Sequence, residues 1–358
     1  MLDNPITSSK QTSYLKSISQ KRLILLGLGL LVLCLAVLGI SAGALNINPW
    51  QVVRTLLGLE SGQSQIAIWN IRLPRVVAGI VAGAGLSVAG CVMQTCLRNP
   101  LASPSTLGIS NAAAFGANLA IIMFEAGSIR SSTADAILIN NPYAVTVSAF
   151  AFSLIAMALI LMLTQFRGFS PESVVLAGVA FGSLFTAGST LVQYFAQDAQ
   201  VAAMVFWTFG DLGRVSWGEV TILSIVIVVA IVYFMLRRWD YNALDSGEDS
   251  AKSLGVNVER IRLGGMLASS MITAVAVSFM GIIGFIGLIG PQIMRRVIGT
   301  DKQFLIPASA LAGACLLLLS DTVARTVISP VVLPVGALTS FFGAPLFLFL
   351  LVRGYRKI

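Results

Sequence analysis

Long apolar stretches without charge recur along this chain, and they constrain its fold more than any other feature. The first, from Leu23 to Leu45, has no charged residue and is long enough to cross the roughly 30 Å hydrocarbon core of a bilayer. Only 11% of the 358 residues are charged, whereas a soluble domain needs about 25%. We therefore predict an all-α membrane protein that crosses the bilayer many times.

About ten stretches are long and apolar enough to be spans. They lie near residues 23–44, 74–96, 106–124, 142–165, 173–195, 217–236, 261–282, 283–299, 304–324 and 334–352. A cleavable signal peptide has a shorter apolar core of about 7–15 residues, so the first stretch is interpreted as a permanent helix. The predicted organisation is an N-terminal tail (1–22), one transmembrane domain (23–352) and a C-terminal tail (353–358).

Basic residues gather on one side of these spans. Seventeen lie in the two tails and the loops that follow even-numbered spans, whereas six, all arginine, lie on the other side. Because cytoplasmic loops carry the excess of Lys and Arg, both termini are predicted to be cytoplasmic. The net charge of +8 is thereby explained by topology and gives no support to nucleic-acid binding.

Two spans share a sequence pattern. IRLPRVVAGIVAGAGLSVAG begins at Ile71 and IRLGGMLASSMITAVAVSFMG begins at Ile261. Five spans separate the two starts, so the copies would enter the membrane from opposite faces. We expect the inverted repeat that many transporters use to build a central pathway, with chance similarity as the alternative.

The residue types present argue against catalysis. The chain has no histidine, which removes the usual proton shuttle and most hydrolytic triads. Cys34, Cys91, Cys96 and Cys315 lie singly in apolar runs, so they are interpreted as packing residues and no metal site is expected. A GxGD aspartyl-protease motif is absent from the sequence. We expect no catalytic residue.

The energy source for transport is also constrained. No Asp, Glu or Lys lies in the middle third of any predicted span, which argues against an ion-coupled carrier because coupling needs a group that changes charge. The sequence contains no GxxxxGK[ST] phosphate loop, so ATP would have to be hydrolysed by another subunit. An ATP-independent carrier or channel is the alternative.

A charged segment interrupts the apolar pattern between the sixth and seventh spans, with seven charges in residues 245–262. Ser246 and Asp249 are typical of a capping box, and Gly255 is placed to end a short helix. Asn257 is expected to cap a second helix that continues into the seventh span. A helix of about two turns does not persist alone in water, so we expect it to dock on a cytoplasmic partner, with a solvated loop as the alternative.

Glycines are patterned in two places. Gly79 and Gly83 form a GxxxG, and MGIIGFIGLIGP has a glycine at every third position from 281 to 290 before Pro291. Small residues let membrane helices pack closely, which is one interpretation. The glycine run is also a poor regular helix, which favours a bent segment beside a transport pathway near residues 281–291.

Several motifs resemble, in order, those of the FecCD-type permeases, the membrane subunits of importers for iron-siderophores, haem and cobalamin. IRLPRVVAGIVAGAGLSVAGCVMQTCLRNPLASPSTLGISNAAAFGA is similar to the N-terminal signature, and LDSGEDSAKSLGVNVERIRL is similar to the coupling segment. GFIGLIGPQIMRR, LLLLSDTVAR and LPVGALTSFFGAPLFLFLL resemble the C-terminal third. The resemblance covers the chain beyond residue 20 and implies a ten-helix type II ABC importer permease fold.

The resemblance also implies partners. The chain would be a multi-pass permease of a bacterial or archaeal cytoplasmic (inner) membrane, paired as a homodimer with the pathway at the interface. Two cytoplasmic ABC ATPases would use ATP and Mg²⁺, and an extracytoplasmic binding protein would deliver the solute. The chain itself would be no enzyme and would hold no cofactor. Iron(III)-siderophore is the expected cargo, with haem or cobalamin as the alternatives.

Roles for individual residues follow from the same resemblance. The coupling segment (243–260) would dock on the ATPase through a short helix with Gly247, Glu248, Ala251, Leu254 and Gly255. Arg72 and Arg325 would contact the binding protein, although an interfacial arginine can also simply anchor a helix end.

Gate and pathway positions are also implied. The loop Asn99-Pro100-Leu101 and the bend Ser170-Pro171 would correspond to cytoplasmic gates, and Gly284 and Gly287 belong to the expected pathway segment. Two positions depart from the family pattern: Gln292 follows Pro291 where histidine is common, and Lys302 replaces a histidine before the ninth span.

Overall fold

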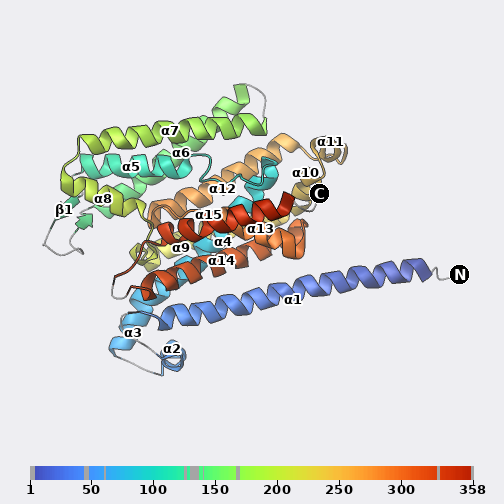
Figure 1. The fold of residues 1–358 in the computed structure, drawn as a ribbon, viewed down its shortest axis with the longest axis horizontal. Helices are drawn as coiled ribbons and strands as arrows, with labels where there is room; N and C mark the ends of the chain where they lie inside the picture. Colours follow the sequence, from blue (N-terminus) through green and yellow to red (C-terminus); the bar gives the residue numbers. More distant parts are fainter. Residues whose placement is uncertain are drawn as a thin grey trace.

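Ten helices occupy the ten predicted spans in the computed structural model, which describes the chain except residues 1–4, 44–47, 60–61, 125–126, 130–136, 140, 167–169, 329–330 and 356–358. They are α1 (Pro5–Ser41), α4 (Leu73–Cys96), α5 (Ile109–Met123), α6 (Pro142–Phe166), α7 (Pro171–Tyr194), α9 (Trp217–Leu236), α12 (Val258–Met280), α13 (Ile286–Ile298), α14 (Lys302–Thr326) and α15 (Val335–Tyr355). These helices lie roughly along one direction (Figure 1). The predicted helical membrane fold is confirmed.

The helices differ in length. Seven are long and apolar enough to cross a membrane within the described residues, whereas α5 and the part Val335–Leu350 of α15 count as shorter apolar helices. α13 has 13 residues, about 20 Å at 1.5 Å per residue, so the predicted full-length eighth span is wrong. The reason lies in the glycine run, because Gly281 ends α12 with a φ of 76° and α13 begins only at Ile286.

Short elements lie between the spans that the sequence pattern did not predict. They are α2 (Pro49–Leu56), α3 (Gln63–Ala67), the π-helical turn η1 (Ile68–Arg72), the antiparallel strands β1 (Gly127–Ile129) and β2 (Ile137–Ile139), α8 (Asp198–Thr208), the 3-10 turn η2 (Leu212–Arg214) and α10 (Arg238–Asp245). The predicted short charged helix is α11 (Glu248–Ser253). α1 begins at Pro5, so the region predicted as an N-terminal tail is helical from that residue.

Small residues place α4 at the centre of the bundle, where it packs against α9, α12, α13 and α14. Gly83 lies against Gly313 of α14, and Gly90 lies so close to Gly287 of α13 that a Cβ atom would collide with the Gly287 carbonyl. Close approach of two backbones is what small residues permit inside a membrane. Gly83 and Gly287 therefore lie at close helix contacts, as the packing interpretation predicts.

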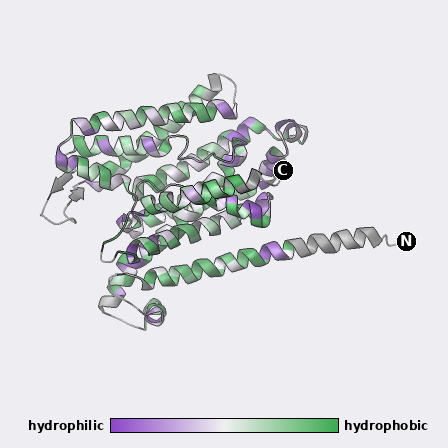
Figure 2. Cartoon of the chain, viewed as in Figure 1, coloured by the Kyte–Doolittle hydropathy of each residue, from purple (hydrophilic) through white to green (hydrophobic). Residues whose placement is uncertain are grey.

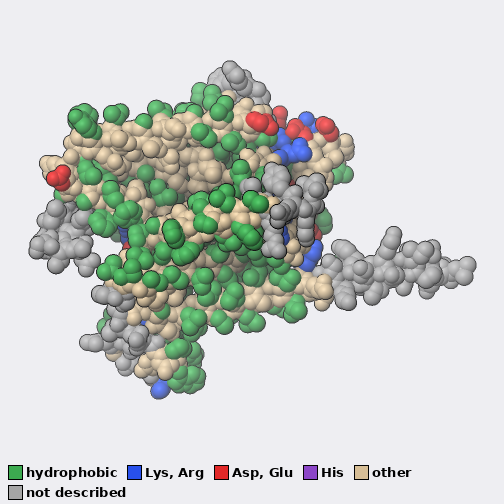
Figure 3. All heavy atoms as spheres, viewed as in Figure 1, with side chains coloured by type: hydrophobic (Ala, Val, Ile, Leu, Met, Phe, Trp, Pro, Cys, Tyr) green, Lys and Arg blue, Asp and Glu red, His purple; other side chains and the backbone are tan. Residues whose placement is uncertain are grey.

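The bundle has two ends, named here for the elements that lie there. α10, α11, the start of α1 and the end of α15 lie at the α11 end, whereas α2, β1 and the C-terminus of α1 lie at the β1 end (Figure 1). Hydrophobic residues line the helices between the ends (Figure 2), and charged side chains gather near α11 (Figure 3). α4 and α12 pack together and run in opposite directions, as the predicted inverted repeat requires.

Candidate functional site

The charged segment after α9 folds into two short helices, α10 and α11, joined by Ser246 and Gly247. The predicted capping box is wrong, because Ser246 ends α10 and its hydroxyl donates to the Asn242 carbonyl at 3.3 Å. Gly247 instead precedes α11, with φ 119° and ψ 156°. This backbone conformation is essentially restricted to glycine, so the sharp turn between the two helices depends on that residue.

The C-terminal end of α11 forms as predicted. Gly255 has a φ of 80°, its N–H donates to the Lys252 carbonyl at 2.9 Å, and the Val256 N–H donates to the Ala251 carbonyl at 3.0 Å. These two hydrogen bonds satisfy carbonyls that a helix end leaves free. Leu254, the residue before Gly255, is 72% exposed.

The Asn257 side chain accepts from the Arg260 N–H at 3.0 Å and caps α12, as predicted. The two caps therefore fix a sharp corner between α11 and α12. Ala251, on the inner side of α11, is fully buried. The helix thus rests on the bundle by one face and exposes its C-terminal tip.

Glu248 joins α11 to the bundle. Its carboxylate pairs with Lys252 of the same helix and with Arg262 of α12, both at 3.1 Å. The Arg262 side chain is almost completely buried, whereas that of Glu248 is partly exposed. The hydrogen bond from Lys252, reinforced by Arg262, holds the pKa of the Glu248 carboxyl below its ordinary value of 4.5. Glu248 is thus charged at neutral pH and fixes α11 to α12.

Lys302 makes a second connection to this segment that the sequence did not reveal. Its side chain is completely buried, and its Nζ pairs with Asp245 at the end of α10. The Lys302 N–H donates to Asn242 Oδ1 at 2.9 Å, and Asn242 Nδ2 donates to Asp301 Oδ1 at 3.0 Å. α10 is therefore fixed to the start of α14 by three polar contacts.

The predicted gate turn at Asn99-Pro100-Leu101 follows α4 at the α11 end. Asn99 Oδ1 accepts from the Leu101 N–H at 2.9 Å, and the Pro100 carbonyl accepts from Gln292 Nε2 of α13 at 3.2 Å. A cavity of about 600 Å³ is lined by this turn, by Asp245 and by the turn between α13 and α14. The structure thus brings one predicted gate and the coupling segment to the same cavity.

The other predicted pathway residues lie elsewhere in the bundle. Ser170 caps α7, accepting from the Ser173 N–H at 3.1 Å, and Pro171 is the first residue of that helix. Gly284 lies beside Ser340 of α15, and Gly287 lies against α4. These glycines therefore occupy helix contacts in this structure, and their role in a pathway stays a prediction.

Pro291 lies inside α13 and has no N–H to donate to the carbonyl four residues earlier, which belongs to Gly287. Gln94 of α4 lies in that place, with its Nε2 3.5 Å from the Gly287 carbonyl oxygen. Arg295 in turn donates to Gln94 Oε1 at 3.4 Å. A polar side chain from the central helix thus compensates for the proline that the sequence indicated as a bend.

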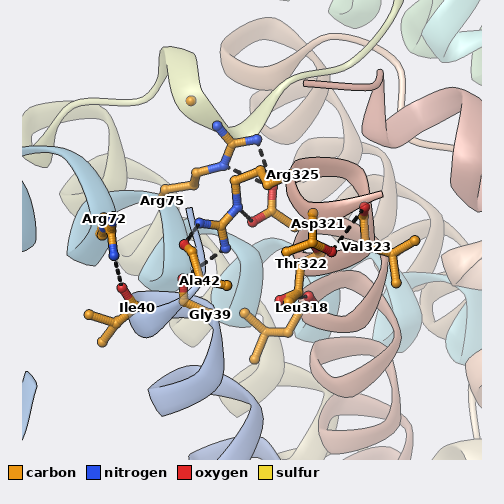
Figure 4. A network of polar contacts seen from close by, with 12 residues as sticks. Gly39, Ile40, Ala42, Arg72, Arg75, Leu318, Asp321, Thr322, Val323 and Arg325 are labelled. Carbon is orange, nitrogen blue, oxygen red and sulfur yellow. Dashed lines mark hydrogen bonds and ion pairs between the residues drawn. The ribbon is translucent and has the colours of Figure 1, made fainter. Parts of the chain in front are cut away.

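Arg72 and Arg325 are both buried at the β1 end, and both hold the C-terminus of α1 (Figure 4). Arg72 donates to the carbonyls of Ile40 and Ser41 at 2.7 and 2.9 Å. Arg325 donates to those of Gly39 and Ala42, each at 2.8 Å. The last carbonyls of a helix lack partners within it and favour a cation, so the two guanidiniums cap α1.

Asp321 organises this cluster from α14 (Figure 4). Its carboxylate accepts from Arg325 Nε at 3.0 Å and from Arg75 Nε at 2.8 Å, and Arg75 also pairs with Asp211 at 3.2 Å. A buried carboxylate needs such partners because isolated burial of its charge is costly. The two resemblance-assigned arginines are therefore brought together, although by different elements and around α1.

Among the described residues, no group of three or more His, Cys, Asp or Glu side chains could hold a metal ion. Cys91, Cys96 and Cys315 are buried and Cys34 is exposed, all four as free thiols. What the arrangement offers is mechanical: an exposed short helix at one end, fixed by ion pairs to the helices behind it, and a neighbouring turn across a cavity.

Comparison with known proteins identifies relatives along almost the whole chain. An ABC transporter permease protein of Methanocaldococcus jannaschii is 54% identical, over 94% of this chain and 97% of the relative. The hemin transport system permease of Yersinia pestis is 37% identical, over 93% and 96%. The Fe(3+)-citrate import system permease of Bacillus subtilis is also 37% identical, over 94% and 98%.

The fold has a counterpart among solved structures. An inward-facing conformation of a metal-chelate type ABC transporter superimposes with a TM-score of 0.78 and 29% identity, covering 93% of this chain and 99% of that chain. The sequence profile of the FecCD transport family matches residues 20–353. Helical architecture, relatives and profile agree, and the chain therefore belongs to the FecCD transport family of ABC transporter permeases.

Proposed function

We propose that this chain is the membrane subunit of an ATP-binding-cassette importer that carries a metal chelate inward. One observation carries the proposal: α11 is held to α12 by Glu248 and Arg262 while Leu254 is exposed at its tip. A short helix with an exposed apolar tip and a fixed base suits a groove in a soluble partner. An ABC ATPase supplies the ATP hydrolysis for which this chain has no phosphate loop.

The proposed orientation places the α11 end in the cytoplasm. Lys and Arg dominate the loops assigned to that side. The gate turn at Asn99 lines a cavity together with Asp245 of α10, and α7, which Ser170 caps, begins at the same end of the bundle (Figure 1). A C-terminal fusion to green fluorescent protein should fluoresce, and one to alkaline phosphatase should be inactive. The reverse pattern would overturn the orientation.

The proposed assembly contains two copies of this chain, two ATPases and an extracytoplasmic binding protein at the β1 end. Because the guanidiniums of Arg72 and Arg325 hold α1, we assign them to supporting the docking face rather than to direct contact. Direct contact with the binding protein, which the family resemblance suggests, would require these two side chains to leave the α1 carbonyls on docking.

Iron(III)-siderophore is the proposed cargo, with haem and cobalamin as alternatives. A groove of about 510 Å³ between α5 and α7 is lined by uncharged residues, which include hydroxyl and amide side chains such as Asn111, Ser183 and Thr186 beside glycines, Val179 and Ala187. The hydroxyl and amide groups can hydrogen-bond to a hydrophilic chelate, which an apolar porphyrin would use less. The relative named for Fe(3+)-citrate and the relative named for hemin are equally similar in sequence. Sequence similarity therefore does not decide the cargo, and the groove is what favours iron(III)-siderophore over haem.

The decisive experiment reconstitutes the chain with its ATPase and binding protein in liposomes. Leu254→Asp should abolish capture of the ATPase and ATP-driven uptake, because it places a charge in the apolar groove of the ATPase that is proposed to receive α11. Leu59→Asp, at an equally exposed leucine of the β1 end, is the matched control and should capture the ATPase normally. Full uptake by Leu254→Asp, or uptake without ATP, would favour the ATP-independent carrier.

The cargo is tested in the same liposomes. Uptake of a ⁵⁵Fe-labelled hydroxamate siderophore is compared with uptake of haem and of cobalamin, each presented with the binding protein. Saturable uptake of the siderophore alone supports the proposed cargo. Preference for haem or cobalamin would replace it without affecting the ATPase model.

A further inference from the structure

Resting on the proposed function, we propose that Lys302 is a positioning residue that transmits movement of the coupling helices to the gate turn at residues 97–101. The relevant juxtaposition is a fully buried ammonium at the start of α14 paired with Asp245 at the end of α10. The role of Lys302 is inferred from the residues that surround its side chain at the start of α14.

Burial makes the pair difficult to separate. The Lys302 side chain has no exposed surface, whereas that of Asp245 is 30% exposed. If α10 moved away from α14, the ammonium would be left buried without its counter-ion, which is strongly unfavourable. Asn242 adds contacts to the Lys302 N–H and to Asp301. α10 and the start of α14 are therefore expected to move as one body.

The same body reaches the gate turn through α13. α13 ends at Ile298 and α14 begins at Lys302, and α13 and α14 pack against each other. α13 holds the turn through Gln292, which donates to the Pro100 carbonyl at 3.2 Å. Arg295 of α13 contacts Gln94 at the end of α4 at 3.4 Å. Polar contacts at both ends and the packing of α14 on α13 thus lead from α10 to residues 97–101.

A cavity of about 600 Å³ is lined jointly by α10, by the gate turn and by the turn between α13 and α14. α10 also packs against α4, so a displacement of α10 reaches the gate turn both through that packing and by the route through α14 and α13. Lys302 is the charged connection with which the second route begins. Arg262 makes the corresponding connection from α11 to α12, and α12 packs against α4.

The test uses the complete transporter in liposomes, with the exposed Cys34 replaced by serine and a spin label at Leu101→Cys. In the otherwise unmodified chain, ATP should drive uptake and change the mobility of the label. Lys302→Met should still capture the ATPase and hydrolyse ATP within about twofold of normal, while uptake per ATP falls about tenfold, within the usual range of coupling between sites. The label should no longer respond to ATP.

Two further variants complete the test. Asp245→Asn removes the charge but keeps an oxygen for Lys302, so it should fold and show the same loss in milder form. Asp240→Asn is the matched control on α10, because Asp240 pairs at 3.3 Å with Arg237, the residue directly before that helix, and should leave coupling unchanged.

The outcomes separate the inference from the proposed function. If Lys302→Met and Asp245→Asn retain both normal uptake per ATP and the response of the label, the inference is wrong while the ATPase model stands. Loss of ATPase capture in these variants would also overturn it, since Lys302 would then shape the docking surface. Uptake that needs no ATP in the unmodified chain would overturn both.

Discussion

Arg72 donates to the Ile40 carbonyl at 2.7 Å and so connects the last residue of η1 to the C-terminus of α1. α1 is otherwise the least enclosed of the long helices, with 17% of its most apolar window buried. Its attachment at the β1 end therefore depends on buried guanidiniums that bind its free carbonyls. This gives the two arginines a structural role that does not require a binding protein.

Replacing Arg325 should loosen α1. Arg325→Met removes hydrogen bonds to Gly39 and Ala42, and bonds of charged groups contribute about 1.5–3 kcal/mol each. We expect a lower melting temperature of the permease in detergent, without any partner present. Arg22→Met changes an exposed arginine of the same helix and should leave the melting temperature unchanged. An unaltered melting temperature combined with weaker binding-protein docking would show that Arg325 acts in docking instead.

Glu248 should titrate below its ordinary range. Because its folded-state pKa is lowered, the pairs with Lys252 and Arg262 stabilise α11 at neutral pH, and this stabilisation is lost as the pH falls through the lowered pKa. Carboxyl ¹³C NMR, with the signal assigned by its loss in Glu248→Gln, should give a midpoint below 4.5. Lys252→Ala should move that midpoint upward, whereas Lys252→Arg should not. A midpoint unaffected by Lys252→Ala would remove Lys252 as the main cause.

Local signals explain which parts of the coupling segment could be predicted. Gly255 and Asn257 act on backbone groups within a few residues, so their sequence positions were sufficient. The prediction for Ser246 was wrong because the hydropathy pattern did not show α10. The Ser246 hydroxyl donates to the Asn242 carbonyl of that helix and so does not cap α11. The pair of Lys302 with Asp245 spans 57 positions, and no local pattern specifies which distant charge a lysine will meet.

The same reasoning applies to the fold. The spans were predictable because a bilayer demands long apolar helices. The short elements α2 and α8 were not predicted, since a window suited to spans averages over them. The acceptors of Arg72 and Arg325 were equally hidden, because backbone carbonyls of α1 carry no sequence signature.

Gly90 should tolerate substitution far less than Gly79, although both lie on α4. A Cβ atom at Gly90 would meet the backbone of Gly287, whereas at Gly79 it would meet side-chain ends of Leu212 and Leu318 at 3.1 and 3.2 Å. Backbone cannot rotate away as a leucine can, and overpacking typically costs about 1–3 kcal/mol or more. Gly90→Ala should lower the yield of monodisperse protein and its melting temperature. Equal behaviour of Gly79→Ala would contradict the close contact of α4 and α13.

Gln94 and Pro291 should show coupled effects on stability. Gln94→Leu removes the donor to the Gly287 carbonyl, and a buried polar group left without a partner costs about 1–3 kcal/mol. Pro291→Ala restores a backbone N–H at the position that reaches the same carbonyl in a regular helix. In the double variant this N–H should replace the lost amide. The melting temperature should then recover part of the loss, although the contact of Gln94 with Arg295 stays absent.

A neighbouring glutamine supplies the control for this double-mutant cycle. Gln292 donates to the Pro100 carbonyl in the gate turn and not to a carbonyl of α13, so Pro291→Ala has nothing to replace when Gln292→Leu is introduced. Adjacent residues couple to some extent through the shared backbone, so the comparison rests on size: the Gln94 cycle should deviate from additivity by more than the Gln292 cycle. Strict additivity in both cycles would mean that Gln94 does not serve the carbonyl exposed by Pro291. The turn of α13 that precedes Pro291 would then be stabilised by the packing of Gly287 against Gly90.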